Sequence, residues 1–205
     1  MSDAELNLRY TLRHEAVLVP LATDLMSYLS EILSGTERID RVQARAKSPS
    51  RFMAKATKEC AGSRKYSDPI NQIQDQIGAR IVTFYLDDVD AVVSKIDKYF
   101  HSIEKQVIKP ESDREFGYFG MHFVVPFPTD ILRPEWEATH RPDFFELQVK
   151  TLFQHAWSEA NHDLGYKQLN GDIGPDDHRK MAWASAQAWG ADRIFNELIR
   201  TALDK

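Results

Sequence analysis

The first part of the chain carries apolar residues at a spacing close to the helical period of about 3.6 residues. They are Leu6, Leu12, Val17, Leu18, Leu21, Leu25, Tyr28, Leu29 and Ile32. Ser2 and Glu5 form the capping-box pattern that begins a helix, and Gly35 is a typical helix end. Pro20 lies inside this pattern, and its missing N–H predicts a break or kink. We therefore expect one kinked helix or two over residues 1–34.

Four later segments are rich in β-branched and aromatic residues or alternate between apolar and polar positions, as strands do. They span residues 38–45, 78–85, 119–127 and 144–151. Helical patterns cover residues 87–100, 152–165 and 176–205. Asp87 or Asp88 is expected to cap the first of these helices, and Pro69 to begin a short helix that ends at Gly78. Strands interspersed with helices predict an α/β or α+β domain with a sheet of about five strands.

Length and composition fit one folded domain over residues 1–205. Hydrophobic residues make up 42% of the chain, which is enough for a core. Cys60 is the only cysteine, so an internal disulfide and a C-x-x-C metal site are excluded, and a reducing compartment fits. No apolar run approaches the roughly 18–20 residues that a membrane span needs, and the N-terminus lacks a signal-peptide core. We expect a cytoplasmic protein without a membrane partner.

The charge of the chain is unevenly distributed. Its net charge of −5 disfavours broad electrostatic binding to duplex nucleic acid. Residues 41–65, the basic segment, contain eight of the 26 basic residues and one of the 31 acidic ones, so 18 basic and 30 acidic residues remain elsewhere. A basic segment in an acidic protein fits a compact anion site, but it equally fits a solvated basic helix face. Charge alone leaves these two interpretations open.

The strand predicted over residues 144–151 has one apolar and one polar face. Its polar positions are Glu146, Gln148 and Lys150. Such a face is also ordinary on a solvated sheet. Gly120 and His122 share one face of the strand over residues 119–127, and Tyr118 precedes them. If the two strands are neighbours, an acid, an amide, a lysine, a histidine and a tyrosine converge.

Candidates for a metal-bound phosphate site follow from the charged residues. Asp75 lies just before a buried strand, and together with Glu146 it could hold Mg²⁺, which prefers one or two carboxylates, waters and phosphate oxygens. A surface helical acid is the alternative for Asp75. No glycine-rich phosphate loop is present, so any triphosphate must be bound by side chains. The candidates for that role are Arg45, Lys47, Arg51 and Lys55.

His155, Glu159 and His162 share one face of the helix predicted over residues 152–165. This spacing also occurs in zinc sites, but no fourth ligand is apparent and the H-E-x-x-H spacing is absent. We favour a hydrogen-bonded polar helix face over the site.

Five motifs of the chain resemble the synthetase domain of the RelA/SpoT family. They are Arg45-Ala46-Lys47-Ser48 (R-x-K-S), Asp75 to Ile81 (D-x-x-G-x-R-I), Gly117-Tyr118 with His122 (G-Y-x-x-x-H), Glu146 to Thr151 (E-x-Q-[IV]-[RK]-T), and Gln154-His155-Ala156-Trp157 with Tyr166-Lys167. They occur in the family's order over residues 41–167, the motif core. Residues 1–34 and 176–205 are then helical extensions.

The resemblance implies a mixed sheet flanked by helices, similar to nucleotidyltransferases. It implies a GTP pyrophosphokinase, which moves the β,γ-pyrophosphate of ATP to the 3′-hydroxyl of GDP or GTP and so makes ppGpp or pppGpp, with Mg²⁺ as cofactor. Larger members carry a hydrolase domain for which this chain has no room, so no alarmone hydrolase activity is expected.

The resemblance also assigns residues to roles. Those placed at ATP are Arg45, Lys47, Lys55 and Arg80, and Arg51, a candidate from its charge, is grouped with them. Those placed at the acceptor are Tyr118, which would stack on its base, and His122, Gln148, Lys150, Lys109 and Arg114. Asp75 would bind Mg²⁺, and Glu146 would help to hold the metal or take the proton from the attacking hydroxyl.

The chain departs from the family's pattern at Phe119-Gly120, where Arg or Gln followed by Ser is usual. This departure leaves acceptor identity open. The alternative is a toxic synthetase of the same fold that modifies the 3′ end of tRNA or makes adenosine alarmones, with an antitoxin as a further partner. A non-catalytic nucleotide-binding module is the third hypothesis. Small members of the family often form tetramers through terminal helices, so the resemblance also allows a homo-oligomer.

Overall fold

The computed structural model describes residues 2–60, 62–112, 114–117, 119–136, 141–166 and 174–204. Its centre is a five-stranded sheet in the order β1-β4-β7-β6-β5. The strands are β1 (Ile39–Ala46), β4 (Ile77–Thr83), β5 (Glu104–Ile108), β6 (Gly120–Pro126) and β7 (Phe144–Thr151). β4 and β7 are parallel and the other neighbours are antiparallel, which confirms the predicted mixed sheet.

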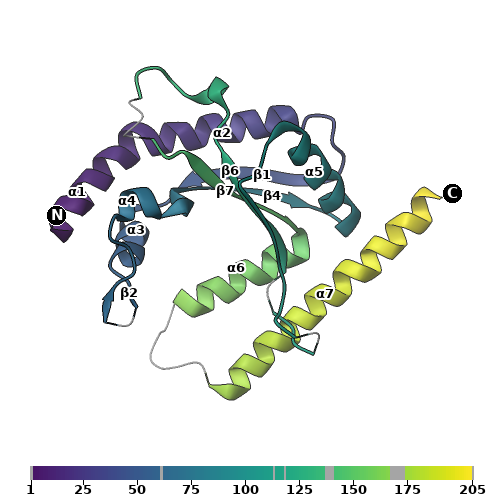
Figure 1. The fold of residues 1–205 in the computed structure, drawn as a ribbon. Helices are drawn as coiled ribbons and strands as arrows, with labels where there is room; N and C mark the ends of the chain where they lie inside the picture. Colours follow the sequence, from purple (N-terminus) through teal and green to yellow (C-terminus); the bar gives the residue numbers. More distant parts are fainter. Residues whose placement is uncertain are drawn as a thin grey trace.

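Helices cover both faces of this sheet. They are α1 (Asp3–Arg13), α2 (Val19–Ile32), α3 (Pro49–Ala56), α4 (Pro69–Gln72), α5 (Leu86–Tyr99), α6 (Leu152–Tyr166) and α7 (Pro175–Leu203). Figure 1 shows α2 and α5 on one side of the sheet and α6 and α7 on the other. Phe145, Leu147 and Val149 of β7 are fully buried in the core, on the side of α2 and α5. The polar positions of β7 therefore face the side of α6.

The N-terminal helix accommodates Pro20 through a wider turn. A π-helical segment, His14–Leu18, joins α1 to α2, and the N–H of Val19 bonds to the carbonyl of His14. Pro20 then lies in the first turn of α2, where its missing N–H costs least. Figure 1 shows the chain bending at this junction, so the predicted kink is confirmed and has a physical form.

Two local expectations were wrong, and two elements were missed. The helix at Pro69 ends at Gln72, and Asp75 lies instead in a 3₁₀ turn, Gln74–Gln76. Neither predicted aspartate is the N-cap of α5; Tyr85 is, and Asp88 accepts a hydrogen bond from the Tyr85 N–H at 3.1 Å. Strand β5 was missed because its residues are mostly exposed at the sheet edge and lack an apolar face. The short hairpin of β2 (Glu59–Cys60) and β3 (Ser63–Arg64) was missed for the same reason.

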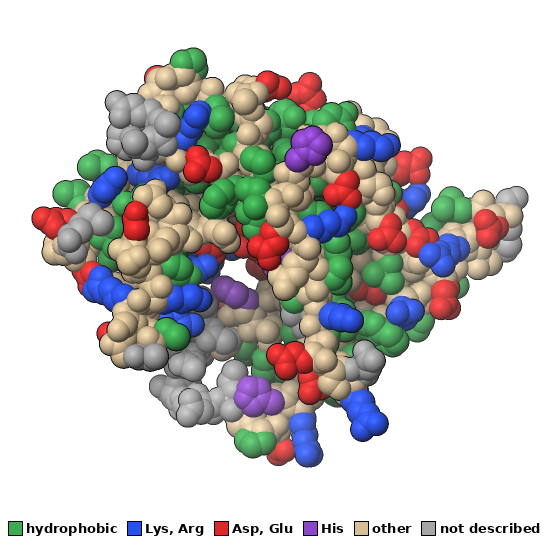
Figure 2. Space-filling view, in the orientation of Figure 1, with side chains coloured by type: hydrophobic (Ala, Val, Ile, Leu, Met, Phe, Trp, Pro, Cys, Tyr) green, Lys and Arg blue, Asp and Glu red, His purple; other side chains and the backbone are tan. Residues whose placement is uncertain are grey.

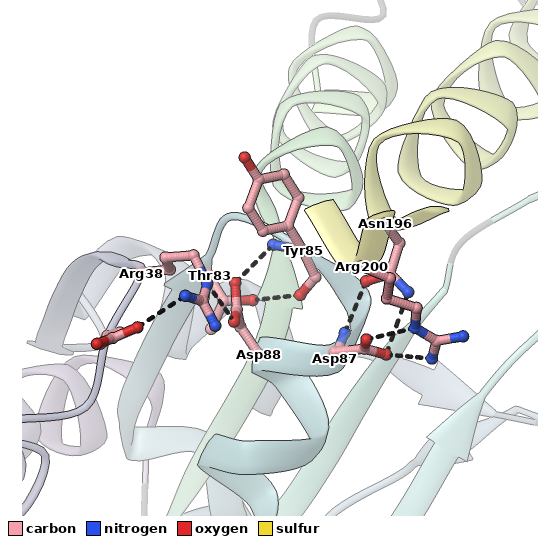
Figure 3. A network of polar contacts seen from close by, with 8 residues as sticks. Arg38, Thr83, Tyr85, Asp87, Asp88, Asn196 and Arg200 are labelled. Atoms are coloured by element: carbon pink, nitrogen blue, oxygen red, sulfur yellow. Dashed lines mark hydrogen bonds and ion pairs between the residues drawn. The ribbon is translucent and has the colours of Figure 1, made fainter. Parts of the chain in front are cut away.

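Polar contacts hold α7 against the rest of the fold. Arg200 donates two hydrogen bonds of 2.6 Å to the carboxylate of Asp87, and Asn196 exchanges two bonds with the same residue (Figure 3). Further along α7, Asp192 accepts a 2.9 Å bond from the hydroxyl of Thr151 at the end of β7. These contacts join α7 to α5 and to β7. Within the described residues, no helix is long and apolar enough to cross a membrane.

Burial raises the pKa of Asp192 from 3.8 to about 6, which makes stability depend on pH. The folded state holds the proton more tightly than the unfolded state, so this contribution is complete below about pH 4 and is lost as pH rises towards 6. Asp192→Asn keeps an acceptor for Thr151 without the buried charge. We expect urea unfolding to show the variant more stable than wild type at pH 7, by on the order of 2 kcal/mol, with the difference shrinking at pH 4. A pH-independent difference would contradict this.

Candidate functional site

A cavity of about 710 Å³ lies on the polar face of the sheet. Its lining comes from β1, α3, the β2–β3 region, the Asp75 turn, β4, β7 and α6. Figure 2 shows this face hollowed at its centre, with Lys and Arg side chains gathered to one side. The charged and polar lining residues are Arg45, Lys47, Ser48, Arg51, Lys55, Lys58, Lys65, Asp75, Arg80, Glu146, Gln148, Glu159 and His162. Six of the eight basic residues of the basic segment are among them, which favours the anion-site interpretation.

Parallel pairing of β4 with β7 places the central side chains. Gly78 lies opposite Glu146, and Arg80 lies opposite Gln148. Antiparallel pairing then brings His122 of β6 opposite Gln148 on the other side of β7. Residues paired across strands point to the same face, so these side chains form one polar surface. Arg80, Glu146 and Gln148 line the cavity, and His122 adjoins it through its contact with Glu146.

Asp75 is the charge partner of two lysines. Lys47 Nζ lies 2.8 Å and Lys55 Nζ 3.0 Å from its carboxylate oxygens. Buried hydrogen bonds fix the turn that carries Asp75, because the amide of Gln76 donates to the carbonyls of Ile70 and Ile73 at 2.7 and 2.9 Å. The carboxylate is therefore held at the cavity wall, beside the entrance to β4.

A stacked aromatic pair supports the lysines from behind. Tyr10 of α1 and Phe52 of α3 are both fully buried, with ring centroids 3.6 Å apart and planes 6° from parallel. The Tyr10 hydroxyl donates to the carbonyl of Lys47 at 2.9 Å. Arg51 and Lys55, one turn apart on the same helix as Phe52, line the cavity. Helix α1 therefore helps to position Lys47 and α3 through Tyr10, although Tyr10 itself does not line the cavity.

Glu146 is hydrogen-bonded within its own face. Its Oε1 lies 3.3 Å from His122 Nδ1 and accepts a 2.6 Å bond from the Gln148 amide. The His122 contact, followed by Gln148 and the charge of Lys55, outweighs burial and lowers the pKa of Glu146 to about 2. The carboxylate is therefore ionised at neutral pH, as a metal ligand must be.

Arg80 reaches across the cavity to α6. Its Nη1 donates to Glu159 at 2.6 Å and lies 3.2 Å from His155 Nδ1. Burial, with the charge of Arg80, lowers the pKa of His155, so a neutral ring can accept this bond. The polar face of α6 is thus hydrogen-bonded over the site, as expected. No group of three metal-ligating side chains occurs among the residues described.

The acceptor residues assigned from the sequence are less closely gathered. Lys150 is 1% exposed, and its Nζ donates to Ser158 of α6 at 3.3 Å instead of lining the cavity. Burial, followed by the charge of Arg80, lowers its pKa to about 7. Lys109 and Arg114 are exposed between β5 and β6 and do not line the cavity in the described part of the chain. Tyr118 lies outside the described residues.

Several contributors were missed from the sequence. Lys58 and Lys65 line the cavity beside Tyr66, and the basic composition of their segment was the available signal. Tyr10 gave no signal, because an aromatic residue on an amphipathic helix does not reveal which backbone group its hydroxyl will meet.

Comparisons with known proteins identify the family of this fold and site. The family described as "Region found in RelA / SpoT proteins" matches residues 44–171. This chain belongs to the RelA/SpoT family.

Among curated RelA/SpoT-type relatives, GTP pyrophosphokinase YjbM of Bacillus subtilis (strain 168) is 28% identical over 160 residues, which cover 74% of this chain and 72% of the relative. Small alarmone synthetase 1 from Bacillus subtilis shares the fold, with a TM-score of 0.75, 22% identity and 96% and 97% of the two chains covered. Its structure bound to its product pppGpp gives a TM-score of 0.70 at 23% identity over the same shares.

We expect Tyr10→Phe to lower the free energy of unfolding by about 1 kcal/mol, because the Lys47 carbonyl loses its buried donor while the ring stack remains. Urea unfolding measures this loss. Tyr99→Phe, which changes a 53% exposed tyrosine, is the matched control and should stay within about 0.5 kcal/mol of wild type. Equal effects of the two substitutions would show that the hydroxyl contact contributes nothing.

Proposed function

We propose that this chain transfers the β,γ-pyrophosphate of ATP to the 3′-hydroxyl of GDP or GTP, making ppGpp or pppGpp. The observation that carries this proposal is one cavity that combines Asp75 and Glu146 with cations from four parts of the chain. Transfer of a charged phosphoryl group needs positioning and charge neutralisation, and little covalent chemistry from the protein. Family membership and the GTP pyrophosphokinase relative support the same reaction.

The residues of the cavity fit a divalent cation with a triphosphate. Mg²⁺ prefers one or two carboxylates with phosphate and water oxygens, and Asp75 and Glu146 supply the carboxylates. Lys47 and Lys55 now neutralise Asp75 at 2.8 and 3.0 Å. When the triphosphate binds, their ammonium groups exchange the Asp75 carboxylate for phosphate oxygens as partners. Bound Mg²⁺ supplies further neutralisation of the charge on the phosphates.

The remaining basic residues of the ATP side surround the bound nucleotide. Arg45 and Arg51 offer forked guanidinium donors to phosphate oxygens. Arg80 is held towards the cavity by Glu159, which fixes its plane before the nucleotide arrives.

Glu146 serves mainly as a fixed negative charge that helps to hold Mg²⁺ in position. A carboxylate with a pKa of about 2 is a weak base, so proton removal from the hydroxyl is its less favoured role. His122, in contact with Glu146, lies on β6, the strand that follows Gly117, and in this proposal it approaches the acceptor. Lys150 contributes by joining β7 to α6 through Ser158.

A second candidate function is supported by Phe119. Its side chain lines a small cavity with Trp157 and Trp189, so residue 119 offers no polar group to a guanine edge. A toxic synthetase of the same fold, acting on adenosine nucleotides or tRNA, would not need that contact.

An acceptor panel separates the two functions. Purified protein with γ-labelled ATP and Mg²⁺ should label GDP and GTP, and should leave GMP, ADP, ATP and bulk tRNA with little or no label. Thin-layer chromatography measures the products. Label on tRNA or on adenosine nucleotides with GDP inert would establish the toxin function, and no transfer to any acceptor would leave only a nucleotide-binding module.

Glu146→Gln should lower transfer by at least about 100-fold, because the replaced group loses its charge beside the reacting phosphates. Binding of an ATP analogue, measured by calorimetry without Mg²⁺, should change only a few-fold. Glu104→Gln is the matched control: it removes an exposed carboxylate from the same row of the sheet, since Glu104 pairs with Val124 and Val124 with Glu146. Near-normal turnover in Glu146→Gln would remove this residue from the mechanism.

A further inference from the structure

The segment that leads into β6 rests on the C-terminal helix. Figure 1 shows the chain between β5 and β6 extending down to α7. There the Ser185 hydroxyl donates a 2.6 Å hydrogen bond to the carbonyl of Gly117. One residue earlier, the ring of Phe116 meets the edge of Trp189 with centroids 5.8 Å apart. A helix distant in sequence therefore contacts the segment directly before His122.

A small cavity of about 20 Å³ continues this contact. Its lining residues are Gly117 and Phe119 together with residues of α6 and α7, which include Trp157, Ser185 and Trp189. Aromatic side chains at positions 116 and 119 are thus both turned towards α7. The segment is held by packing as well as by the Gly117 hydrogen bond.

Helix α7 is a firm support because it is fixed at three further places. Trp157 of α6 donates to the Met181 carbonyl at 3.2 Å. Asp192 bonds to Thr151, which ends the strand that carries Glu146. Near its C-terminus, Arg200 and Asn196 hold Asp87 (Figure 3). The position of Ser185 is therefore set relative to both β7 and α5.

We propose that Ser185 is a positioning residue for acceptor binding, fixing the peptide at Gly117 so that the segment before His122 is preformed for the acceptor nucleotide. This inference rests on the proposed function for what the acceptor is. Ser185 is 3% exposed, and a water that entered the adjacent small cavity in place of its hydroxyl would not be attached to α7. The Gly117 carbonyl then lacks its donor, and the segment samples other orientations that bind the acceptor less well.

Three variants test the contact. Ser185→Ala removes the hydroxyl, and Ser185→Thr restores it, with the adjacent small cavity leaving room for the added methyl group. Thr201→Ala is the matched control, since it removes an exposed hydroxyl of the same helix that bonds only within α7, to the carbonyl of Glu197. Calorimetry measures binding of GDP and of a non-hydrolysable ATP analogue, steady-state kinetics gives the two KM values, and hydrogen exchange follows the peptide 114–121.

For Ser185→Ala we expect GDP affinity to fall and the acceptor KM to rise about 3- to 10-fold. The ATP analogue affinity, the ATP KM and kcat should stay within about 2-fold of wild type, while amide exchange rises locally in residues 114–121. Ser185→Thr should restore wild-type values, and Thr201→Ala should retain them.

Unchanged exchange in residues 114–121, or equal losses for GDP and the ATP analogue, would overturn the inference. A uniform rise of exchange over the whole chain would also overturn it, because Ser185 would then serve global stability. If wild type binds GDP but makes no product, the proposed function fails, and GDP binding by the variants still decides the role of Ser185. If the wild-type protein does not bind GDP, both the proposed function and the inference about Ser185 fail.

Discussion

The parallel pairing of β4 with β7 is the constraint from which the site is built. It joins two strands that are far apart in sequence, and its register sets Gly78 beside Glu146 and Arg80 beside Gln148. Since side chains alternate along a strand, the same register that buries Leu147 and Val149 turns Glu146 and Gln148 towards the cavity. A slip of one residue would exchange core and cavity faces together. Stability and chemistry therefore depend on one pairing.

Charge around this pairing is balanced within the protein before any nucleotide arrives. Asp75 holds two lysines, Glu159 holds Arg80, and Glu146 is held by His122 and Gln148. Cations gathered in a shared cavity repel each other, and these acids reduce that repulsion while keeping the donors directed inwards. Under the proposed function, a triphosphate entering the cavity would bring its own negative charge and pair with the cations. The acids would then be available to a bound cation, so the ion pairs of the ATP side would exchange partners without a net gain of unpaired charge.

Much of this arrangement could be predicted from the sequence, where local pattern and chemistry agree. The alternation of residues 144–151 predicted β7 with its bounds, and the candidates Arg45, Lys47, Arg51, Lys55, Asp75 and Glu146 do share the cavity. Strand β5 could not be predicted, since an exposed edge strand has no apolar face to reveal it. The Tyr10–Lys47 and Ser185–Gly117 bonds could not be predicted either, because each joins a side chain to a backbone carbonyl at least 37 residues away. Such contacts depend on the packing of helices, which no short motif encodes.

The order of the contributing segments along the chain has an evolutionary consequence. The cations that line the large cavity come from the stretch between Arg45 and Arg80, whereas the segment before His122 and the helix that supports it come from the later part of the chain. With the proposed assignments, the acceptor side is served by the segment before His122 and by α7, whereas the cations of the ATP side come from residues 45–80 and β7 supplies Glu146. Substitutions confined to that segment and to the face of α7 that supports it can change which nucleotide is modified while the residues that bind ATP are kept. Enzymes with this fold can therefore come to make different products while the residues that bind ATP stay the same.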